Sequence, residues 1–239
     1  MPRFSANVPG RDPLVTVVVP VFAGQRFLGA ALQSVLAQTY PNVEVIVVDD
    51  GSPDASAEIA SRIEGVRVLR QDHRGVAAAR NAGVEAASGE LIAFLDQDDE
   101  WSPEKLARQV AFMTERPELG LTMTHLETVL MPGIARPHWF APIWLIGPQP
   151  GFVPSTWMLR REVFDRIGPL DTSYLIASDS DWLTRAKDAG VMSAMLRDVL
   201  VRWRVHGANG SYDQDTMRRE LVRMLRGTAR RQREAGHAG

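Results

Sequence analysis

The chain has 239 residues, of which 45% are hydrophobic and 23% charged, and its formal net charge is −2. This is the composition of a globular domain, and the near-balance of charge gives no support to nucleic-acid binding. The absence of cysteine excludes disulfides, thiolate zinc sites and cysteine nucleophiles.

Two segments bear on whether a leader or a membrane span is expected. Residues 1–12 contain no apolar core of the kind that a signal peptide needs. The longest apolar stretch elsewhere, Phe140–Ile146, is far too short to span a bilayer and contains Pro142. We therefore expect a soluble, cytoplasmic protein without a transmembrane segment.

Strands and helices alternate through the N-terminal part of the chain. Short β-branched or apolar runs predict the strands, and apolar residues at helical spacing predict the helices between them. The predicted strands are Val15–Val19, Val43–Val48, Val66–Leu69 and Glu90–Leu95, and the predicted helices are Arg26–Gln38, Asp54–Ile63 and Val76–Ala87. This alternation predicts an α/β fold with a doubly wound parallel sheet, whose ligands bind at the carboxyl ends of the strands. Pro20, Asp49 and Asp96 lie at such ends.

Clustered carboxylates follow the apolar strand Leu91–Leu95. Packing does not require acids at the end of a buried strand, because like charges repel and lose solvation. A divalent cation removes this cost, and carboxylates on a short turn suit Mg²⁺ or Mn²⁺ bound to a substrate phosphate. Alternatively, the acids lie near the N-terminus of a helix that begins at residues 102–104. That alternative explains Asp99 better than Asp96 and Asp98.

A second acidic turn, Asp49-Asp50-Gly51-Ser52, follows the predicted second strand. A carboxylate there can accept hydrogen bonds from a nucleobase or a ribose. Alternatively, the turn only caps the next helix, with Gly51 at positive φ. Its combination with Asp96-Gln97-Asp98, which ends a later strand of the same predicted sheet, favours a ligand site.

The second half of the sequence is less regular. The segment Met131–Pro154 is rich in proline and glycine and predicts an ordered but irregular loop. The predicted helices of this half are Pro103–Arg116, Arg161–Ile167, Ser180–Ala189 and Asp213–Arg233, and the predicted strands are Leu119–His125, Val191–Met195 and Leu200–Val205.

Four segments resemble, in order, the motifs of family-two glycosyltransferases. They are Val18–Phe22, Val47–Ser52, Gly75–Gly83 and Phe94–Asp99. The order makes this match far more specific than any single motif. The resemblance implies the GT-A fold, in which a nucleotide-binding α/β half is fused to an acceptor-binding half. It implies one domain over residues 1–239, with these halves at 13–116 and 117–212 and a basic helix and tail at 213–239.

The resemblance also assigns a nucleotide-sugar site. The nucleotide-binding residues would be Pro20, Phe22, Asp49, Asp50, Arg80, Asp96 and Gln97, and the metal ligands would be Asp96, Asp98 and His206. Within this set Asp49 would contact the base, Asp96 the ribose, and Asp98 the cation on the diphosphate. Arg80 would lie beside the nucleotide; alternatively, it is an arginine on a solvated helix surface.

The segment Ala177–Trp182 falls where many family members carry their catalytic acids, so Asp179 would be the catalytic base. Inverting transfer needs a carboxylate opposite the leaving diphosphate, to take the proton of the acceptor. Ser178 replaces the usual glutamate, which leaves the neighbouring role open. Alternatively, Asp179 and Asp181 form the cap and first turn of the following helix, and we adopt that interpretation for Asp181.

The segment Arg202–Ser211 resembles the closing Arg-x-His-x-x-Asn-x-Ser motif of smaller family members. His206 would complete the metal shell or contact the diphosphate; alternatively, it is structural. The Arg-Trp pair in this segment also occurs in processive synthases. Val199 stands where those enzymes have glutamine, so we expect non-processive transfer.

The implied activity is metal-dependent, inverting transfer of a sugar from a UDP-sugar, or another nucleotide-diphosphate sugar, to an unidentified acceptor hydroxyl. Mn²⁺ or Mg²⁺ would be the cofactor. One alternative is an inactive nucleotide-sugar-binding protein. Another is a phosphoacceptor signalling domain, which also clusters acids at strand ends but needs a lysine at a later strand end. Lys105 and Lys187 both fall in predicted helices, which disfavours the latter.

The last predicted helix combines an apolar face with seven arginines. The apolar face is formed by Met217, Leu221, Met224, Leu225 and Thr228, and the arginines are Arg218, Arg219, Arg223, Arg226, Arg230, Arg231 and Arg233. Such a helix can lie on an anionic membrane, which would place the protein at its inner face. Alternatively, the apolar face packs on the domain and the charges are solvated.

Overall fold

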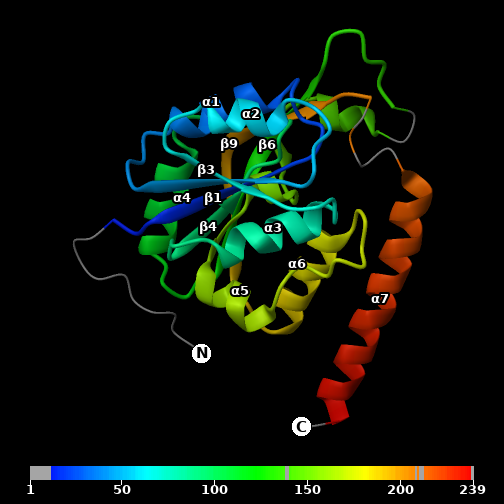
Figure 1. Ribbon diagram of the computed structural model, residues 1–239. Helices are drawn as coiled ribbons and strands as arrows, with labels where there is room; N and C mark the ends of the chain where they lie inside the picture. Colours follow the sequence, from blue (N-terminus) through cyan, green and yellow to red (C-terminus); the bar gives the residue numbers. More distant parts are fainter. Residues whose placement is uncertain (1–11, 138–139, 208, 210–212, 238–239) are drawn as a thin grey trace.

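The computed structural model describes residues 12–137, 140–207, 209 and 213–237 (Figure 1). Residues 1–11, where the sequence predicts no signal peptide, and Ser211 of the closing motif lie outside this description. In the described residues nine strands form one sheet, in the order β3-β2-β1-β4-β8-β6-β9-β5, with β7 paired to β6. The strands are β1 (Val15–Val21), β2 (Val43–Asp49), β3 (Val66–Arg70), β4 (Leu91–Phe94), β5 (Glu100–Trp101), β6 (Leu121–Leu130), β7 (Gln149–Pro150), β8 (Met158–Arg160) and β9 (Ser193–Val205).

The N-terminal half of the sheet is parallel, as the sequence predicts. β1 pairs with β2 along its whole length, ending at Val21 opposite Asp49, and β4 lies on its other side in the same direction. β3 extends the parallel arrangement beyond β2. Every residue of β1 is buried, because helices cover both faces of the sheet. β1, β2 and β4 therefore end at the same edge, where the sequence places its acidic turns.

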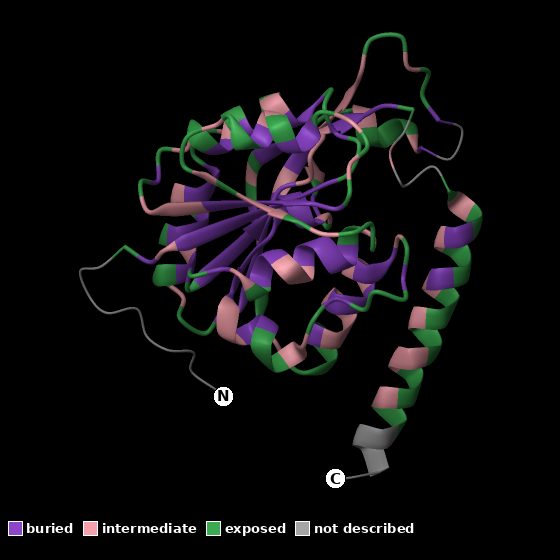
Figure 2. Cartoon of the chain, in the orientation of Figure 1, coloured by how far each residue is buried: buried purple, intermediate pink, exposed green. Residues whose placement is uncertain are grey.

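Seven α-helices and two short 3₁₀ segments are present in the described residues. They are α1 (Leu28–Leu36), α2 (Ser56–Ser61), α3 (Val76–Glu85), α4 (Lys105–Thr114), α5 (Arg161–Ile167), α6 (Ser178–Asp188), α7 (Gln214–His237), η1 (Pro142–Leu145) and η2 (Pro154–Thr156). α1, α2 and α4 cover one face of the sheet, and α3, α5 and α6 cover the other (Figure 1). The strands between these two layers are almost wholly buried (Figure 2).

Successive residues of β1 contribute to two separate cores. Val17 and Val19 pack in the core beneath α1 and α4, whereas Val18 packs in the core beneath α3. A Cβ on Gly83 of α3 would lie 2.3 Å from Val18 Cγ1, so this helix approaches the sheet too closely for any larger residue. Arg80 lies three residues earlier on the same face of α3, toward the edge where the strands end.

The second half of the sheet differs from the prediction in its details. β8, which the sequence did not reveal, runs antiparallel between β4 and β6. The two predicted strands at 191–195 and 200–205 are one long strand, β9, whose pairing with β6 shifts register around His125. The segment Met131–Pro154 is irregular as predicted, although it contains η1 and β7. The same sheet thus runs through both halves of the chain.

The terminal helix α7 packs along α6 (Figure 1). Thr184 Oγ1 lies 3.7 Å from Met224 Sδ, and Arg231 Nε donates to Asp188 at 3.0 Å. Leu225, which the sequence places on the apolar face of this helix, is 61% exposed, because the packed face of the helix follows Glu220 and Met224. Among the described residues, no helix combines the length and the apolar character needed to cross a bilayer.

Candidate active site

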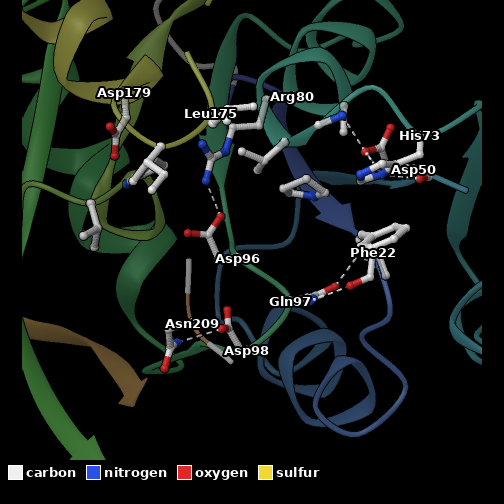
Figure 3. A pocket seen from close by; sticks show the side chains of 18 of the residues that line it. Phe22, Asp50, His73, Arg80, Asp96, Gln97, Asp98, Leu175, Asp179 and Asn209 are labelled. Carbon is white, nitrogen blue, oxygen red and sulfur yellow. Dashed lines mark hydrogen bonds and ion pairs between the residues drawn. The ribbon is translucent and has the colours of Figure 1, made fainter. Parts of the chain in front are cut away.

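A pocket of about 570 Å³ opens at the edge where β1, β2 and β4 end. That volume is in the range of small-molecule sites. Eight of the predicted site residues line the pocket, namely Pro20, Phe22, Asp50, Arg80, Asp96, Gln97, Asp98 and Asp179 (Figure 3). The structure therefore brings together side chains from β1, α3, α6 and the turn after β4.

One side of the pocket is formed by two stacked rings. Phe22 and His73 lie with their ring centroids 4.0 Å apart and an interplanar angle of 29°. His73 Nδ1 lies 2.9 Å from the Asp50 carboxylate, which is itself almost fully buried. His73 was not predicted from the sequence, although it follows the end of β3 and thus lies at the ligand-binding edge of the sheet.

Asp50 holds the loop that carries His73. Its Oδ1 accepts hydrogen bonds from Gln71 Nε2 at 2.6 Å and from Arg74 N at 2.9 Å. Its Oδ2 accepts from Gly75 N at 2.8 Å. These bonds fix the path of residues 71–75 above the pocket, so Asp50 acts on the pocket mainly through this loop.

Asp49, predicted to contact the base, does not line the pocket. Asp49 and Asp50 are consecutive, so their side chains leave the end of β2 in different directions. Asp49 is buried, and its Oδ1 accepts a hydrogen bond from Ser52 N at 3.3 Å. In this structure Asp49 therefore stabilises the turn after β2, and its predicted contact with the base stays a prediction.

Gln97 holds the end of β1 rather than presenting free polar groups to the pocket. Its Oε1 accepts from Phe22 N at 2.9 Å, and its Nε2 donates to Phe22 O at 3.0 Å (Figure 3). A Cβ on Gly24 would lie 2.3 Å from Gln97 Oε1, so the glycine leaves room for this pair of bonds. Gln97 therefore fixes the position of the Phe22 ring.

Arg80 lies between two acids on the other side of the pocket. Its Nη2 is 2.5 Å from Asp96 Oδ1, and the residue is 5% exposed, so it is not on a solvated helix surface. Arg80 Nε is buried and has no hydrogen-bond partner among the described residues. Burial raises the pKa of Asp179, although the positive charge of Arg80 opposes the shift. Arg80 lines the pocket, and a guanidinium at such a place is suited to an anionic ligand.

The three predicted metal ligands occupy different places. Asp96 and Asp98 line the pocket, whereas His206 lies behind Asp98, with Nε2 2.8 Å from Asp98 Oδ2 and its ring stacked on Phe27. Asn209, a residue of the closing motif with no predicted role, also donates to Asp98 Oδ2, at 3.0 Å (Figure 3). These two bonds orient Asp98, which is the role of a residue outside the ligand shell.

The carboxylates of the pocket offer a divalent cation few protein ligands. Among the described residues, no group of three or more histidine, aspartate or glutamate side chains is arranged to hold a metal ion. Asp98 Oδ1 has no partner within the described part of the chain, so it is available. One or two carboxylates, with water and phosphate oxygens, are the usual protein contribution to a magnesium site. Asp98 and Asp96 therefore fit a cation that a bound diphosphate also holds.

Asp99 is part of the support of the pocket rather than of its lining. It is 1% exposed, and it accepts hydrogen bonds from Ser155 Oγ at 2.6 Å and from Arg204 N at 3.2 Å. Burial, together with the nearby Asp98 and Asp96, raises its pKa well above the usual range. Asp99 thus joins the turn after β4 to β9 and η2. The residues next to Asp99 in the sequence do not indicate this role, because its partners lie far along the chain.

Comparisons with known proteins agree with the motifs. A model of the family described as Glycosyl transferase family 2 matches residues 16–168. An uncharacterized glycosyltransferase of Nostoc sp. is 31% identical over 213 residues, which cover 82% of this chain and 66% of the relative. The putative teichuronic acid biosynthesis glycosyltransferase TuaG of Bacillus subtilis is 38% identical over 109 residues, covering 44% of this chain and 43% of TuaG. The chain spans no more than about two thirds of the length of such relatives.

Solved structures share the fold. The mannosyltransferase PcManGT of Pyrobaculum calidifontis, in complex with GDP-Man and Mn²⁺, has a TM-score of 0.72 at 22% identity, covering 96% of this chain and 68% of that one. S. aureus TarS 1-349, in complex with UDP-GlcNAc, has a TM-score of 0.70 at 20% identity, covering 84% and 61%. These likenesses confirm the predicted GT-A fold.

Proposed function

Because this chain belongs to glycosyl transferase family 2, we propose that it transfers a sugar from a nucleotide-diphosphate sugar to an acceptor hydroxyl. The donor nucleotide is UDP, and the transfer is non-processive and inverts the anomeric centre. The observation that carries this proposal is one pocket with stacked rings on one side and the Arg80, Asp96 and Asp98 charges beside Asp179 on the other (Figure 3).

The rings of Phe22 and His73 suit a nucleobase, which binds by stacking on aromatic faces. In the absence of a ligand these rings stack on each other. A base would therefore bind on an outer face of this pair or separate the two rings. Asp96 would then contact the ribose, as the family resemblance implies, and Pro20 would line the same end of the pocket.

The diphosphate would lie at the charged end. The Arg80 guanidinium lines the pocket and would bind a phosphate oxygen. Asp98 and Asp96 would hold Mn²⁺ or Mg²⁺, and such a cation supplies positive charge that stabilises a leaving diphosphate. His206 and Asn209 would keep Asp98 in place through the two bonds to its Oδ2.

Asp179 would act as the general base. It lines the pocket from the first turn of α6, on the far side from the Phe22–His73 pair (Figure 3). An acceptor hydroxyl between Asp179 and the sugar would lose its proton to the carboxylate as its oxygen attacks the anomeric carbon from the face opposite the diphosphate. Burial raises the pKa of Asp179, which makes the carboxylate a stronger base than an exposed aspartate.

The outer face of α7 is proposed to contact an anionic membrane surface. Val222 and Leu225 are 48% and 61% exposed, and Arg218 and Arg226 are exposed beside them. Apolar side chains flanked by arginines are the composition of helices that lie on anionic lipid. The inner leaflet carries such lipid, so a cytoplasmic protein at the inner face of the membrane is part of this proposal.

Ligand binding and donor hydrolysis test the function. UDP and GDP are titrated with Mn²⁺ or with EDTA, and UDP-GlcNAc and GDP-mannose are then incubated with the protein and Mn²⁺. We expect UDP to bind about tenfold or more tightly with Mn²⁺, and UDP-GlcNAc or another UDP-sugar to be hydrolysed slowly. Equal affinity in EDTA would refute the cation site, tighter GDP binding would refute the nucleotide assignment, and binding without turnover would indicate an inactive nucleotide-sugar-binding protein.

A further inference from the structure

One carboxylate of α7 binds the segment that leads into α6. Glu220 accepts three backbone hydrogen bonds, from Leu175 N at 2.6 Å, Ile176 N at 2.9 Å and Ala177 N at 2.8 Å. Glu220 is only 8% exposed, although it belongs to a helix whose other acids and bases are mostly solvated. Successive N–H groups that converge on one anion form a nest, a backbone site with positive polarity.

The bound segment forms part of the pocket. Leu175 and Ile176 line it, and Asp179 follows two residues after Ala177, the residue that caps α6. Figure 3 shows Leu175 and Asp179 on the same side of the pocket as Arg80. Any shift of the backbone at 175–177 would therefore move the pocket wall and the first turn of α6 together.

α7 contacts this segment over two helical turns. Met217, one turn before Glu220, lines the pocket itself. Arg223, one turn after it, places its guanidinium 3.6 Å from the centroid of the Tyr174 ring and donates to Ser173 Oγ at 2.9 Å. Glu220 is the central contact of the three, and it alone binds the backbone.

We propose that Glu220 is a positioning residue, which holds residues 175–177 so that Leu175 and Ile176 close the pocket and Asp179 faces the donor. This inference rests on the proposed function, because it assigns Glu220 an effect on Asp179 as base. The three bonds require a charged acceptor with two oxygens. Burial alone raises the pKa of Glu220, but the N–H groups of Ala177, Leu175 and Ile176 lower it overall, so the side chain is ionised at neutral pH.

Glu220→Gln tests the contact with little change in volume. The amide keeps one acceptor oxygen but places an NH₂ group against an N–H donor, so at least one of the three bonds is lost. Hydrogen exchange of a peptide covering residues 173–180 is followed by mass spectrometry. Exchange should become about tenfold faster in Glu220→Gln, the equivalent of one lost hydrogen bond.

Asp215→Asn is the matched control. Asp215 is an exposed acid on the same helix, so this variant removes the same charge without touching the nest. Its exchange at 173–180 should equal that of the unmodified protein. Unchanged exchange in Glu220→Gln, or equal acceleration in both variants, would overturn the proposal.

Catalysis separates positioning from general stability. Donor hydrolysis with Mn²⁺ should fall about 10- to 100-fold in Glu220→Gln, since a small displacement of a catalytic group has effects of this size. UDP affinity should stay within about threefold, because the stacking and Arg80 contacts are elsewhere. A parallel loss of hydrolysis, UDP affinity and thermal stability would indicate a merely structural role, and undiminished hydrolysis would also overturn the proposal.

Chemical rescue tests whether the effects of a substitution at Glu220 come from the lost carboxylate and not from a wider change in the fold. Glu220→Ala leaves the three N–H donors facing a gap, and added formate can occupy it as a free carboxylate. We expect formate, and not chloride at the same ionic strength, to slow exchange at 173–180 and to restore part of the hydrolysis. Failure of formate to change either would count against the nest. If the unmodified protein hydrolyses no donor, the proposed function fails, whereas the exchange rates still test the contact.

Discussion

At the scale of single residues, the two aspartates in the first turn of α6 have different surroundings. Asp179 lines the pocket, and burial raises its pKa. Asp181 is buried and pairs with Arg185, with 2.8 Å between Oδ2 and Nε. The same helical turn thus contains one carboxylate with a structural partner and one directed to the ligand site, and substitution of each has a different expected outcome.

Asp179→Asn should abolish most of the activity while leaving nucleotide binding intact. The amide retains the size of the side chain but cannot take a proton, so donor hydrolysis should fall by about two to four orders of magnitude. UDP affinity should barely change. In the unmodified protein, hydrolysis should rise as the pH passes through the raised pKa of Asp179, because only the ionised form acts as a base. Initial rates across a pH series measure both effects.

Asp181→Asn serves as the comparison for that experiment. Loss of the Arg185 pair should lower the melting temperature of this variant and leave its hydrolysis rate and pH profile nearly unchanged at temperatures where it is folded. If Asp181→Asn loses activity and Asp179→Asn keeps it, the base has been assigned to the wrong residue.

The sequence identified the residues near the site better than their individual roles. The sequence pattern does not distinguish Asp49 from Asp50. The structure shows that Asp49 is the last residue of β2 and that Asp50, which follows it, lines the pocket. Gln97 and His206 stay predicted ligands, and the structure adds contacts of Gln97 with Phe22 and of His206 with Asp98 that the sequence did not reveal. Such support depends on contacts between residues far apart in the chain, which no local spacing encodes.

At the scale of secondary-structure elements, α7 presents two faces with different contacts. Glu220 and Met224 face the domain, whereas Val222 and Leu225 are exposed beside Arg218 and Arg226. The inner face thus packs on the domain, whereas contact of the exposed outer face with a membrane stays a proposal. The inner face contacts α6. Membrane contact by the outer face is tested by a binding experiment.

Removal of two outer arginines should weaken binding to anionic vesicles. The double variant Arg218→Gln/Arg226→Gln is compared with the unmodified protein on vesicles of phosphatidylcholine alone and of an equimolar mixture with phosphatidylglycerol. Each arginine near such a surface contributes about 1 kcal/mol, so binding should weaken about 30-fold. Cosedimentation at low salt measures the change.

The double variant Arg62→Gln/Arg70→Gln removes the same charge from exposed positions near the opposite end of the fold, around α2 and β3. It should bind the mixed vesicles as the unmodified protein does. Equal binding by all three proteins, or binding to phosphatidylcholine alone, would contradict an electrostatic contact through α7.

Elements with a strong repeat pattern were predictable, and short ones were not. The first four strands and the helices between them have apolar periodicity over whole elements, and all were predicted within a few residues of their bounds. β5 and β8 contain two and three residues, too few to show an alternation. The break that suggested two strands at 191–205 corresponds to the irregular register between β6 and β9.

At the scale of the whole molecule, a lysine is buried where the two halves of the sheet meet. Lys105 is 0% exposed; its Nζ donates to Trp157 O at 3.2 Å and lies 3.8 Å from the centroid of the Trp101 ring. Burial lowers its pKa well below the usual 10.5. Such a lysine costs stability at neutral pH, because folding requires loss of its proton or burial of its charge.

Lys105→Met should therefore be more stable than the unmodified protein at pH 7, by about 1 to 2 kcal/mol. The folded pKa lies below the unfolded one, so the unfolded chain binds more protons between these values, and stability rises with pH across that window. The methionine variant should lack this rise. Urea unfolding at several pH values, with the exposed Lys187→Met as control, measures it. If the stability of the three proteins changed with pH in the same way, the lowered pKa of Lys105 in the folded protein would be contradicted.

The way in which Asp50 holds residues 71–75 bears on how such a pocket can diversify. Two of the bonds to Asp50 come from the backbone of Arg74 and Gly75, which every non-proline residue can supply. His73 Nδ1 also contacts the Asp50 carboxylate, but the two backbone bonds do not depend on the side chain at position 73, whose ring contacts Phe22 in the pocket. Substitution of that side chain can therefore alter the surface offered to the proposed nucleobase, at the cost of one contact to Asp50, while the two backbone bonds still hold the loop.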